Sequence, residues 1–414
     1  MRLPRPLRAL RHRDFRLFWC GQLVSLSGTW MQSLGQSWLV LELTNSPFRL
    51  GLLTALQFGP FLVLSFFTGV LADRLPKRRL LTCTQATLLL QAATLSILVS
   101  SGHVRYWHVA VLAACAGIVN TLDMPARQSF IVEMVGKEDL LNAIALNSAA
   151  FNAARVVGPA AAGFLIGRYG VATAFALNAG SFVAVIAALW WIRSEGLSQG
   201  PVRASLLDQV AEGLRYAVQT PRIVMVLALL FTTSLCIFNY NVVVPLLAKD
   251  VLHQDAHGFG VLMAMLGTGA LVGAVALTVL ATSRPPFTFI LAAATVVSVA
   301  TLGLGLARQF WMAGTLLFVM GLSGIVFMTS CNTTLQLGVP DRLRGRMMSL
   351  YTLVFVGTTP IGSFLIGSIA GGAGPKGAFI AGGGLSLAFV VVIALWRRAR
   401  RRRIAVEPPP TPAA

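Results

Sequence analysis

The chain of 414 residues is 56% hydrophobic and only 11% charged, and its formal net charge is +19. A soluble protein of this size needs more charge on its surface, and the apolar residues gather instead in runs of roughly 20, the length at which an α-helix crosses a hydrocarbon layer. The basic excess does not indicate nucleic-acid binding, because Lys and Arg cluster in the connections between those runs.

Twelve apolar runs predict twelve transmembrane helices, because none alternates apolar and polar residues as the strands of a membrane barrel do. The runs cover residues 15–43, 48–72, 80–101, 106–124, 142–167, 171–193, 221–248, 258–282, 286–307, 310–335, 347–372 and 376–396. A long hydrophilic stretch, Arg193–Arg222, divides them into two sets of six. We therefore expect an all-α membrane protein with six-helix bundles at 1–196 and 221–396, a cytoplasmic linker at 197–220 and a basic, Pro-rich cytoplasmic tail at 397–414.

The first run carries a stripe of polar side chains spaced three or four residues apart, which places them on one face of a helix. The stripe consists of Gln22, Ser25, Thr29, Gln32 and Gln36. Amides facing lipid would be costly, so the stripe must face protein or a water-filled path. Two interpretations stay open, which are hydrogen bonding between helices and the lining of a substrate-binding cavity.

The stretch "GVLADRLPKRR" at Gly69–Arg79 ends the second run. Its basic residues alone would hold a short loop in the cytoplasm. Asp73 is not explained in this way, and it can pair with Arg74 or with the opposite half, where basic residues follow Asp341. Such ion pairs would close the inner face and break when it opens, so we interpret this stretch as an inner gate.

Carboxylates are nearly absent from the middle of the runs, although proton coupling needs a protonatable group in the path. Glu42 lies near the outer end of the first run, and Asp123 lies near the inner end of the fourth, close to Arg127. These residues are the candidates for coupling. The sequence has no GK[ST] phosphate-binding loop, no CxxC pair and no convincing catalytic Ser/His/Asp arrangement, so we expect no cofactor, no metal and no enzymatic activity.

The stretch "ARVVGPAAAG" at Ala154–Gly163 lies within the fifth run. Its small residues let helix backbones approach closely, and Pro159 bends the helix. We expect Gly158 and Pro159 to form a close seam that limits leakage. Arg155 lies at a depth where a charge costs several kcal/mol unless it is paired or faces water. It shares a helix face with Asn152, and two roles stay open for it, a cavity or coupling role and a static ion pair.

Basic residues are unevenly divided between the two sides of the predicted membrane domain. With the N-terminus in the cytoplasm, the outer connections keep only Arg49, Arg105, Arg168, Lys249, Arg308 and Lys376. This positive-inside pattern predicts a multi-pass protein of the cell membrane with both termini in the cytoplasm. The basic cytoplasmic face is expected to meet anionic lipid.

The chain resembles the major facilitator superfamily of secondary transporters along its whole length. The residues Gly69, Asp73, Arg74, Lys77 and Arg78 fill positions of the superfamily's signature loop, in which Pro76 replaces a usual glycine. The residues Gly158, Pro159 and Gly163 match a motif of its drug-antiporter branch. The stretches "FRLFWCGQLVSLSGTWMQ", "WLVLELTNSP" and "LDMPARQSFIVEMV" are similar to the transmembrane secretion effector group, which includes an enterobactin exporter and macrolide efflux pumps.

This resemblance implies two pseudo-symmetric bundles around a central cavity. The cavity would be lined by the first run and by its counterpart, the seventh, which offers Asn239, Tyr240 and Asn241. Such uncharged polar groups suit a bulky, partly apolar solute. We expect a monomeric exporter of a small organic molecule, driven by proton antiport and alternating access. An uptake permease of the same fold is the alternative, followed by a membrane-embedded enzyme or a lipid-handling scaffold.

Overall fold

The computed structural model describes residues 5–195, 214–280 and 285–406, and within these ranges the chain forms helices and no strands. The first half consists of the 3₁₀-helix η1 (Arg5–Arg11) and the helices α1 (Arg13–Thr44), α2 (Pro47–Arg74), α3 (Lys77–Ser100), α4 (Tyr106–Tyr169) and α5 (Val171–Trp191). The second half consists of α7 (Pro221–Cys236), α8 (Tyr240–Leu246), the π-helical turn η2 (Leu247–Val251), α9 (Ala256–Leu280), α10 (Phe287–Leu306), α11 (Phe310–Leu337) and α12 (Asp341–Val406).

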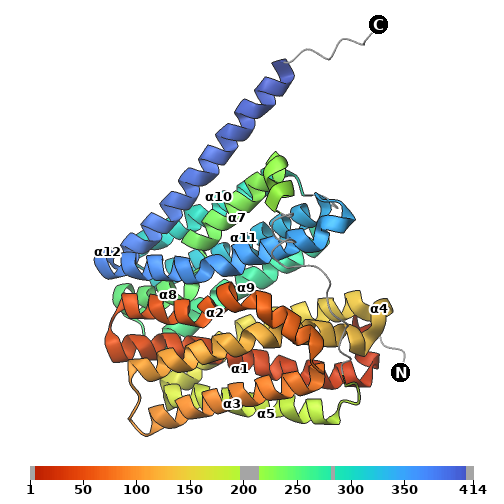
Figure 1. The fold of residues 1–414 in the computed structure, drawn as a ribbon. Coiled ribbons are helices and arrows are strands. Elements are labelled where there is room, and N and C mark those ends of the chain that lie inside the picture. Colours follow the sequence, from red (N-terminus) through yellow and green to blue (C-terminus); the bar gives the residue numbers. More distant parts are fainter. Residues whose placement is uncertain (1–4, 196–213, 281–284, 407–414) are drawn as a thin grey trace.

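The two halves meet through two pairs of long helices, α2 with α12 and α4 with α9. In Figure 1 the halves lie closest at the left and fan apart toward the right, where the N-terminus lies. We call the end of the bundle that carries the N-terminus the proximal end. The opposite end, where α1 finishes and α2 begins, is the distal end.

Within the described ranges, nine helices are long and apolar enough to cross a membrane. Two of them, α4 and α12, each contain two of the twelve predicted runs, which join across Gly136 and Gly374. Both glycines have a positive φ, 69° and 74°, which favours glycine because it lacks a Cβ. The helix α1 is not among the nine. It carries the polar stripe and charged residues in its first turn. The count of nine helices differs from that of twelve runs because α4 and α12 each contain two runs and α1 is not counted.

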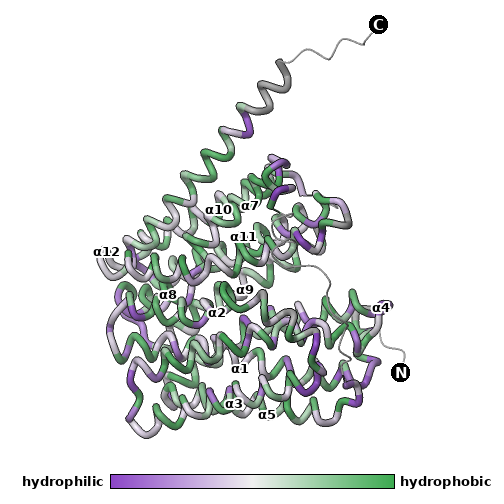
Figure 2. Tube along the Cα trace, viewed as in Figure 1, coloured by the Kyte–Doolittle hydropathy of each residue, from purple (hydrophilic) through white to green (hydrophobic). Residues whose placement is uncertain are grey.

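The hydropathy of the helices fits a membrane environment. Figure 2 shows hydrophobic residues along most of each helix and hydrophilic residues mainly toward the helix ends and connections. Large apolar side chains are also exposed on the outer surface, among them Phe67, Trp190 and Trp311. A soluble protein rarely exposes so much apolar surface, whereas lipid solvates it.

The structure describes only some of the residues around the predicted domain boundaries. Residues 196–213, which make up most of the predicted linker, lie outside the described ranges, and 214–219 are helical. The helix α12 continues through the first residues of the predicted tail to Val406, and 407–414 lie outside the described ranges. The boundaries of the four predicted segments therefore stay predictions.

The N-terminal segment packs against the middle of α4, which lies at the proximal end of the bundle. Asp139, whose side chain is only 2% exposed, forms ion pairs with Arg8 (Nε–Oδ1, 3.0 Å) and Arg11 (Nη2–Oδ2, 2.8 Å). His12 also lies 2.8 Å from Asp139 through Nε2. The hydrogen bond with His12 and the charges of Arg11 and Arg8 hold the pKa of the Asp139 carboxyl below its usual range, although burial opposes this shift. Arg8 and Arg11 of the N-terminal basic cluster thus pair within the protein, although their side chains stay about half exposed.

Candidate functional site

The polar stripe of α1 lies inside the first half, and four of its five members are buried. Gln32 donates through Nε2 to Gln91 Oε1 on α3 (2.9 Å) and accepts through Oε1 from Asn178 Nδ2 on α5 (2.7 Å). Gln22, Ser25 and Gln36 are at most 4% exposed. Only Thr29 is exposed, and its hydroxyl donates to Ser25 O in its own helix. In this conformation Gln32 therefore joins α1 to α3 and α5 within the first half.

The glycines beside the stripe bring α1 and α5 together. A Cβ on Gly28 would lie 2.5 Å from Asn178 Oδ1 and 2.7 Å from Ser181 Oγ. Asn178 can reach Gln32 only because the two helix backbones are this close. Gln32 and the glycines beside it therefore hold α1 and α5 together within the first half.

Two basic residues of the signature loop form hydrogen bonds within the first half. Gly69 lies in α2, and the side chain of Asp73 lies outside the described part of the structure. Arg74 is exposed, and Lys77 is fully buried and donates through Nζ to Leu75 O. Arg78 donates to the carbonyl oxygens of Leu189 (2.8 Å) and Trp190 (3.0 Å), so it caps the end of α5. The sequence alone did not predict this capping role.

Asp123, which is 3% exposed, is the centre of a buried polar cluster between α3 and α4. Its carboxylate accepts from Thr84 Oγ1 (2.7 Å) and Gln85 Nε2 (2.8 Å). Arg127, one helical turn later, donates to it through Nε (2.9 Å) and Nη2 (2.6 Å). The predicted pair of Asp123 and Arg127 is thus formed. The other candidate carboxylate, Glu42, is exposed near the distal end and accepts from Trp38 Nε1.

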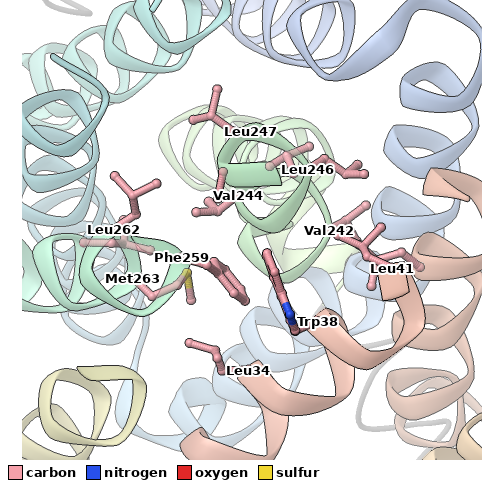
Figure 3. Close-up of a cluster of buried hydrophobic side chains, with 14 of the residues drawn as sticks. Leu34, Trp38, Leu41, Val242, Val244, Leu246, Leu247, Phe259, Leu262 and Met263 are labelled. Atoms are coloured by element: carbon pink, nitrogen blue, oxygen red, sulfur yellow. The ribbon is translucent and has the colours of Figure 1, made fainter. Parts of the chain in front are cut away.

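The distal end is closed by contacts between the halves, which we call the distal seal. Figure 3 shows its apolar part, where Leu34, Trp38 and Leu41 of α1 face Val242 and Val244 of α8 and Phe259 of α9. The rings of Trp38 and Phe259 are stacked with centroids 6.0 Å apart. A polar contact extends the seal, because Lys249 Nζ donates to Leu41 O and Asn45 Oδ1, both at 3.1 Å.

Close backbone contacts complete the distal seal on both sides. A Cβ on Gly260 of α9 would lie 2.6 Å from Gly163 Cα and 2.7 Å from Pro159 O of α4. On the other side, a Cβ on Gly51 of α2 would lie 2.5 Å from Ser363 O of α12. Pro159 therefore lies at the seam between the halves. Gly158 instead packs within the first half, where a Cβ would lie 2.5 Å from Trp30 Cβ.

We expect the substitution Gly260→Leu to prevent closure of the distal seal, because the backbone atoms that its Cβ would meet cannot move aside separately. The protein should fold but transport poorly. The measurement is the reaction of a single cysteine at Val244, fully buried in the native protein, with a membrane-impermeant thiol reagent, in a background lacking the five native cysteines. Reactivity should rise in the Gly260 variant. Gly180→Leu is the matched control, because nothing lies within 4 Å of its Cβ position. Equal reactivity in both variants would contradict this role of Gly260.

The helix of the seventh run is broken at Ile237–Asn239, between α7 and α8. Asn239, 3% exposed, supports the break by donating through Nδ2 to Leu235 O (2.9 Å) and by accepting from Ser363 Oγ of α12 (2.9 Å). In this conformation Asn239 thus links its own helical turn to α12. The break turns the following residues, Tyr240 and Asn241, toward the first half.

A cluster between the halves brings together side chains from α1, α4 and α8, and we call it the central cluster. Its members are Trp30, Ser33, Arg155, Tyr240 and Asn241. The Arg155 guanidinium carbon lies 5.9 Å from the ring centroid of Trp30 and 5.9 Å from that of Tyr240. Asn241 Nδ2 donates to Ser33 Oγ (3.2 Å) across the same boundary. The sequence pointed to Arg155, Tyr240 and Asn241, but it missed Trp30 and Ser33, which lie outside the regular stripe.

Aromatic side chains of the second half adjoin the central cluster. The ring centroid of Phe238 lies 5.8 Å from that of Tyr240 and 6.1 Å from that of Phe355, which stacks on Tyr351. Asn152 is close in sequence to Arg155, but its Nδ2 donates to Ser148 O within its own helix (2.8 Å). The central cluster thus combines one cation, neutral hydrogen-bonding groups and flat apolar rings. This composition suits an organic molecule that has both polar and aromatic parts.

Comparison with known proteins agrees with this architecture. A model of the family described as transmembrane secretion effector matches residues 5–408. The multidrug efflux pump Tap of Mycolicibacterium fortuitum is 28% identical over 382 residues, which cover 90% of this chain and 92% of that protein. The enterobactin exporter EntS of Citrobacter koseri is 25% identical over 407 residues, 97% of this chain and 95% of that protein. The staphyloferrin A transporter of Staphylococcus aureus is 25% identical over 265 residues, 63% of this chain and 66% of that protein.

Solved structures share the fold. The nucleoside transporter NupG superposes with a TM-score of 0.72 at 10% identity, covering 92% of this chain and 98% of that chain. A bacterial homologue of the human lysosomal transporter Spinster, solved in an inward-facing and unoccupied conformation, superposes with a TM-score of 0.70 at 14% identity, covering 97% and 99%. At these identities the likeness concerns the fold alone. Because the family model matches nearly the whole chain, the chain belongs to the transmembrane secretion effector family, and it is a membrane transporter of the major facilitator type and not an enzyme.

Proposed function

We propose that this protein exports a small organic molecule, such as a drug, a siderophore or a related metabolite, by alternating access. The observation that carries the proposal is the central cluster, which both halves build and which the distal seal separates from one side of the membrane. A site of this kind can face one side at a time if the halves rock about it. Relatives that align over most of the chain are named as an efflux pump and an exporter, which favours export over uptake.

The orientation and surroundings in the membrane follow from the charge pattern. We assign the proximal end, which carries the N-terminus, to the cytoplasm, because most basic connections lie there, and we assign the basic C-terminal tail to the same side. Basic residues of that face that do not pair within the protein would meet anionic lipid. The distal seal then closes the outer face, and the conformation described here is one that releases or accepts substrate on the cytoplasmic side. The protein acts as a monomer in this proposal, since both halves of the site come from one chain.

Proton antiport is the proposed driving force, and the pair of Asp123 and Arg127 is its proposed carrier. Protonation of Asp123 would weaken its bond with Arg127 and free the guanidinium to take another partner. Glu42, exposed near the distal end, is the second candidate. Asp73 keeps its proposed role as an inner gate, because closure of the proximal end requires contacts between the halves that differ from those of the distal seal.

The expected result in a transport assay is export that follows the proton gradient. An efflux-deficient host that produces the protein should tolerate higher concentrations of some compounds in an antibiotic panel. Everted membrane vesicles should then accumulate such a compound while their lumen is acidic, and an uncoupler should abolish the accumulation. ATP depletion at a constant gradient should leave it unchanged. Accumulation that follows ATP and ignores the gradient would refute proton antiport, and transport only in the uptake direction would refute export.

A further inference from the structure

Arg155 carries a charge in the middle of a membrane span without a carboxylate partner in the described part of the chain. It lies at the centre of the predicted run 142–167 and is half-buried. The ion pairs found among the described residues involve Arg8, Arg11, His12, Arg13 and Arg127. The static ion pair that the sequence left open for Arg155 is therefore not formed within this part of the structure. A charge at this depth needs compensation or water.

The neighbours of Arg155 compensate its charge only in part. Trp30 and Tyr240 present aromatic rings at 5.9 Å, a distance at which a cation–π contact is still attractive but weak. The Tyr240 hydroxyl also forms a hydrogen bond with Arg155, but it carries no charge. Asn241 and Ser33 bond to each other and bring no charge. The backbone of Arg155 is closely packed against α9, because a Cβ on Gly267 would lie 2.7 Å from Arg155 O. The local structure thus holds the residue in place without neutralising it.

The surroundings of Arg155 differ from those of Arg127. Arg127 donates two hydrogen bonds to Asp123 and is 15% exposed at its side chain, so its charge is neutralised within the protein. Arg155 instead contacts one ring from each half of the transporter. A ligand bound to its guanidinium would therefore touch elements of both halves, as an alternating-access substrate must.

We propose that Arg155 recognises the negative charge of the transported molecule, and that the substrate is an organic anion with a flat apolar part. This inference rests on the proposed transport function. A carboxylate would form charge-assisted hydrogen bonds with the guanidinium, which is planar and suited to binding both carboxylate oxygens. The rings of Trp30 and Tyr240, with Phe238 beside them, would receive the flat part of the molecule. The neutral amide of Asn241 adds a hydrogen-bonding group at the same boundary.

The test uses two dyes that share a xanthene frame and differ in charge, anionic fluorescein and cationic rhodamine 123. Their binding to the purified full-length protein in lipid nanodiscs is measured by fluorescence anisotropy. Fluorescein should bind more tightly than rhodamine 123. The substitution Arg155→Gln should weaken fluorescein binding by about tenfold or more, because it removes the positive charge and the charge-assisted hydrogen bonds that a carboxylate would form. It should leave rhodamine 123 binding unchanged or improve it, and Arg155→Lys should fall between the wild type and Arg155→Gln for fluorescein.

The matched control is Arg308→Gln, which removes one positive charge from an exposed residue outside the central cluster. This variant should bind both dyes as the wild type does. Thermal unfolding of each variant, measured in the same nanodiscs, separates loss of binding from loss of folding. The proposal is overturned if fluorescein fails to bind the wild type, if it binds no better than rhodamine 123, or if folded Arg155→Gln binds it unchanged. A protein that exports in vesicles but shows no anion preference loses only this inference, whereas an anion preference without export contradicts the proposed function.

Discussion

Replacing Asp123 with alanine should remove most of the folded protein from the membrane. The carboxylate accepts hydrogen bonds from Thr84, Gln85 and Arg127, and the substitution leaves all three donors without it. Breaking a buried ion pair from one side typically costs about 3–5 kcal/mol, because the remaining charge stays buried without compensation. The measurement is the amount of monodisperse protein recovered in mild detergent, together with its thermal unfolding midpoint.

A neutral double variant separates the structural role of this pair from coupling. Asp123→Asn with Arg127→Gln removes both charges and keeps similar volumes, so it should recover most of the folded protein. If Asp123 carries the coupling proton, this folded variant should no longer respond to the proton gradient in vesicles. Gradient-driven accumulation at the wild-type rate would show that the pair only stabilises the first half. The coupling proton would then have to bind to Glu42 or to another residue.

The second large effect is expected for Gln32→Leu, which should lower the amount of folded protein and leave substrate preference unchanged. Gln32 uses both its amide oxygen and its amide nitrogen between α1, α3 and α5. Leucine would leave Asn178 Nδ2 and Gln91 Oε1 buried without this partner. Each such group costs roughly 1–3 kcal/mol in proteins, although measured hydrogen bonds between membrane helices tend to be weaker. Thermal unfolding and membrane abundance are the readouts.

Thr29→Val is the matched control for Gln32→Leu, because Thr29 belongs to the same stripe but is exposed and bonds only within its own helix. It should leave abundance unchanged. The substitution Asn178→Leu should reduce abundance as Gln32→Leu does, and the double variant should cost less than the sum of the two. A Gln32→Leu protein with normal abundance and a changed substrate preference would instead show that the stripe lines the substrate path.

The spacing of the polar residues in the α1 stripe predicts only part of their surroundings. The spacing of its five polar residues fixed a common helix face, and the physical argument that amides avoid lipid fixed that this face meets protein or water. Neither argument can say which neighbour lies opposite. That depends on Gly28, Gln91 and Asn178, which come together only when α3 and α5 pack against α1. The same holds for Arg78, whose spacing in the signature loop gives no sign that it caps the end of α5.

The sequence by itself determined the membrane class, the order of the apolar segments, the family and the presence of an unusual charge at Arg155, because length, hydropathy and motif spacing are local properties of the chain. Only the tertiary structure decided what surrounds that charge. Trp30 and Tyr240 are 210 positions apart. They meet Arg155 because the helix of the seventh run is broken at Ile237–Asn239 and because close contacts such as that of Gly163 with Gly260 join the two halves. Contacts at such separations depend on how whole helices pack, and no pattern within a single helix encodes them.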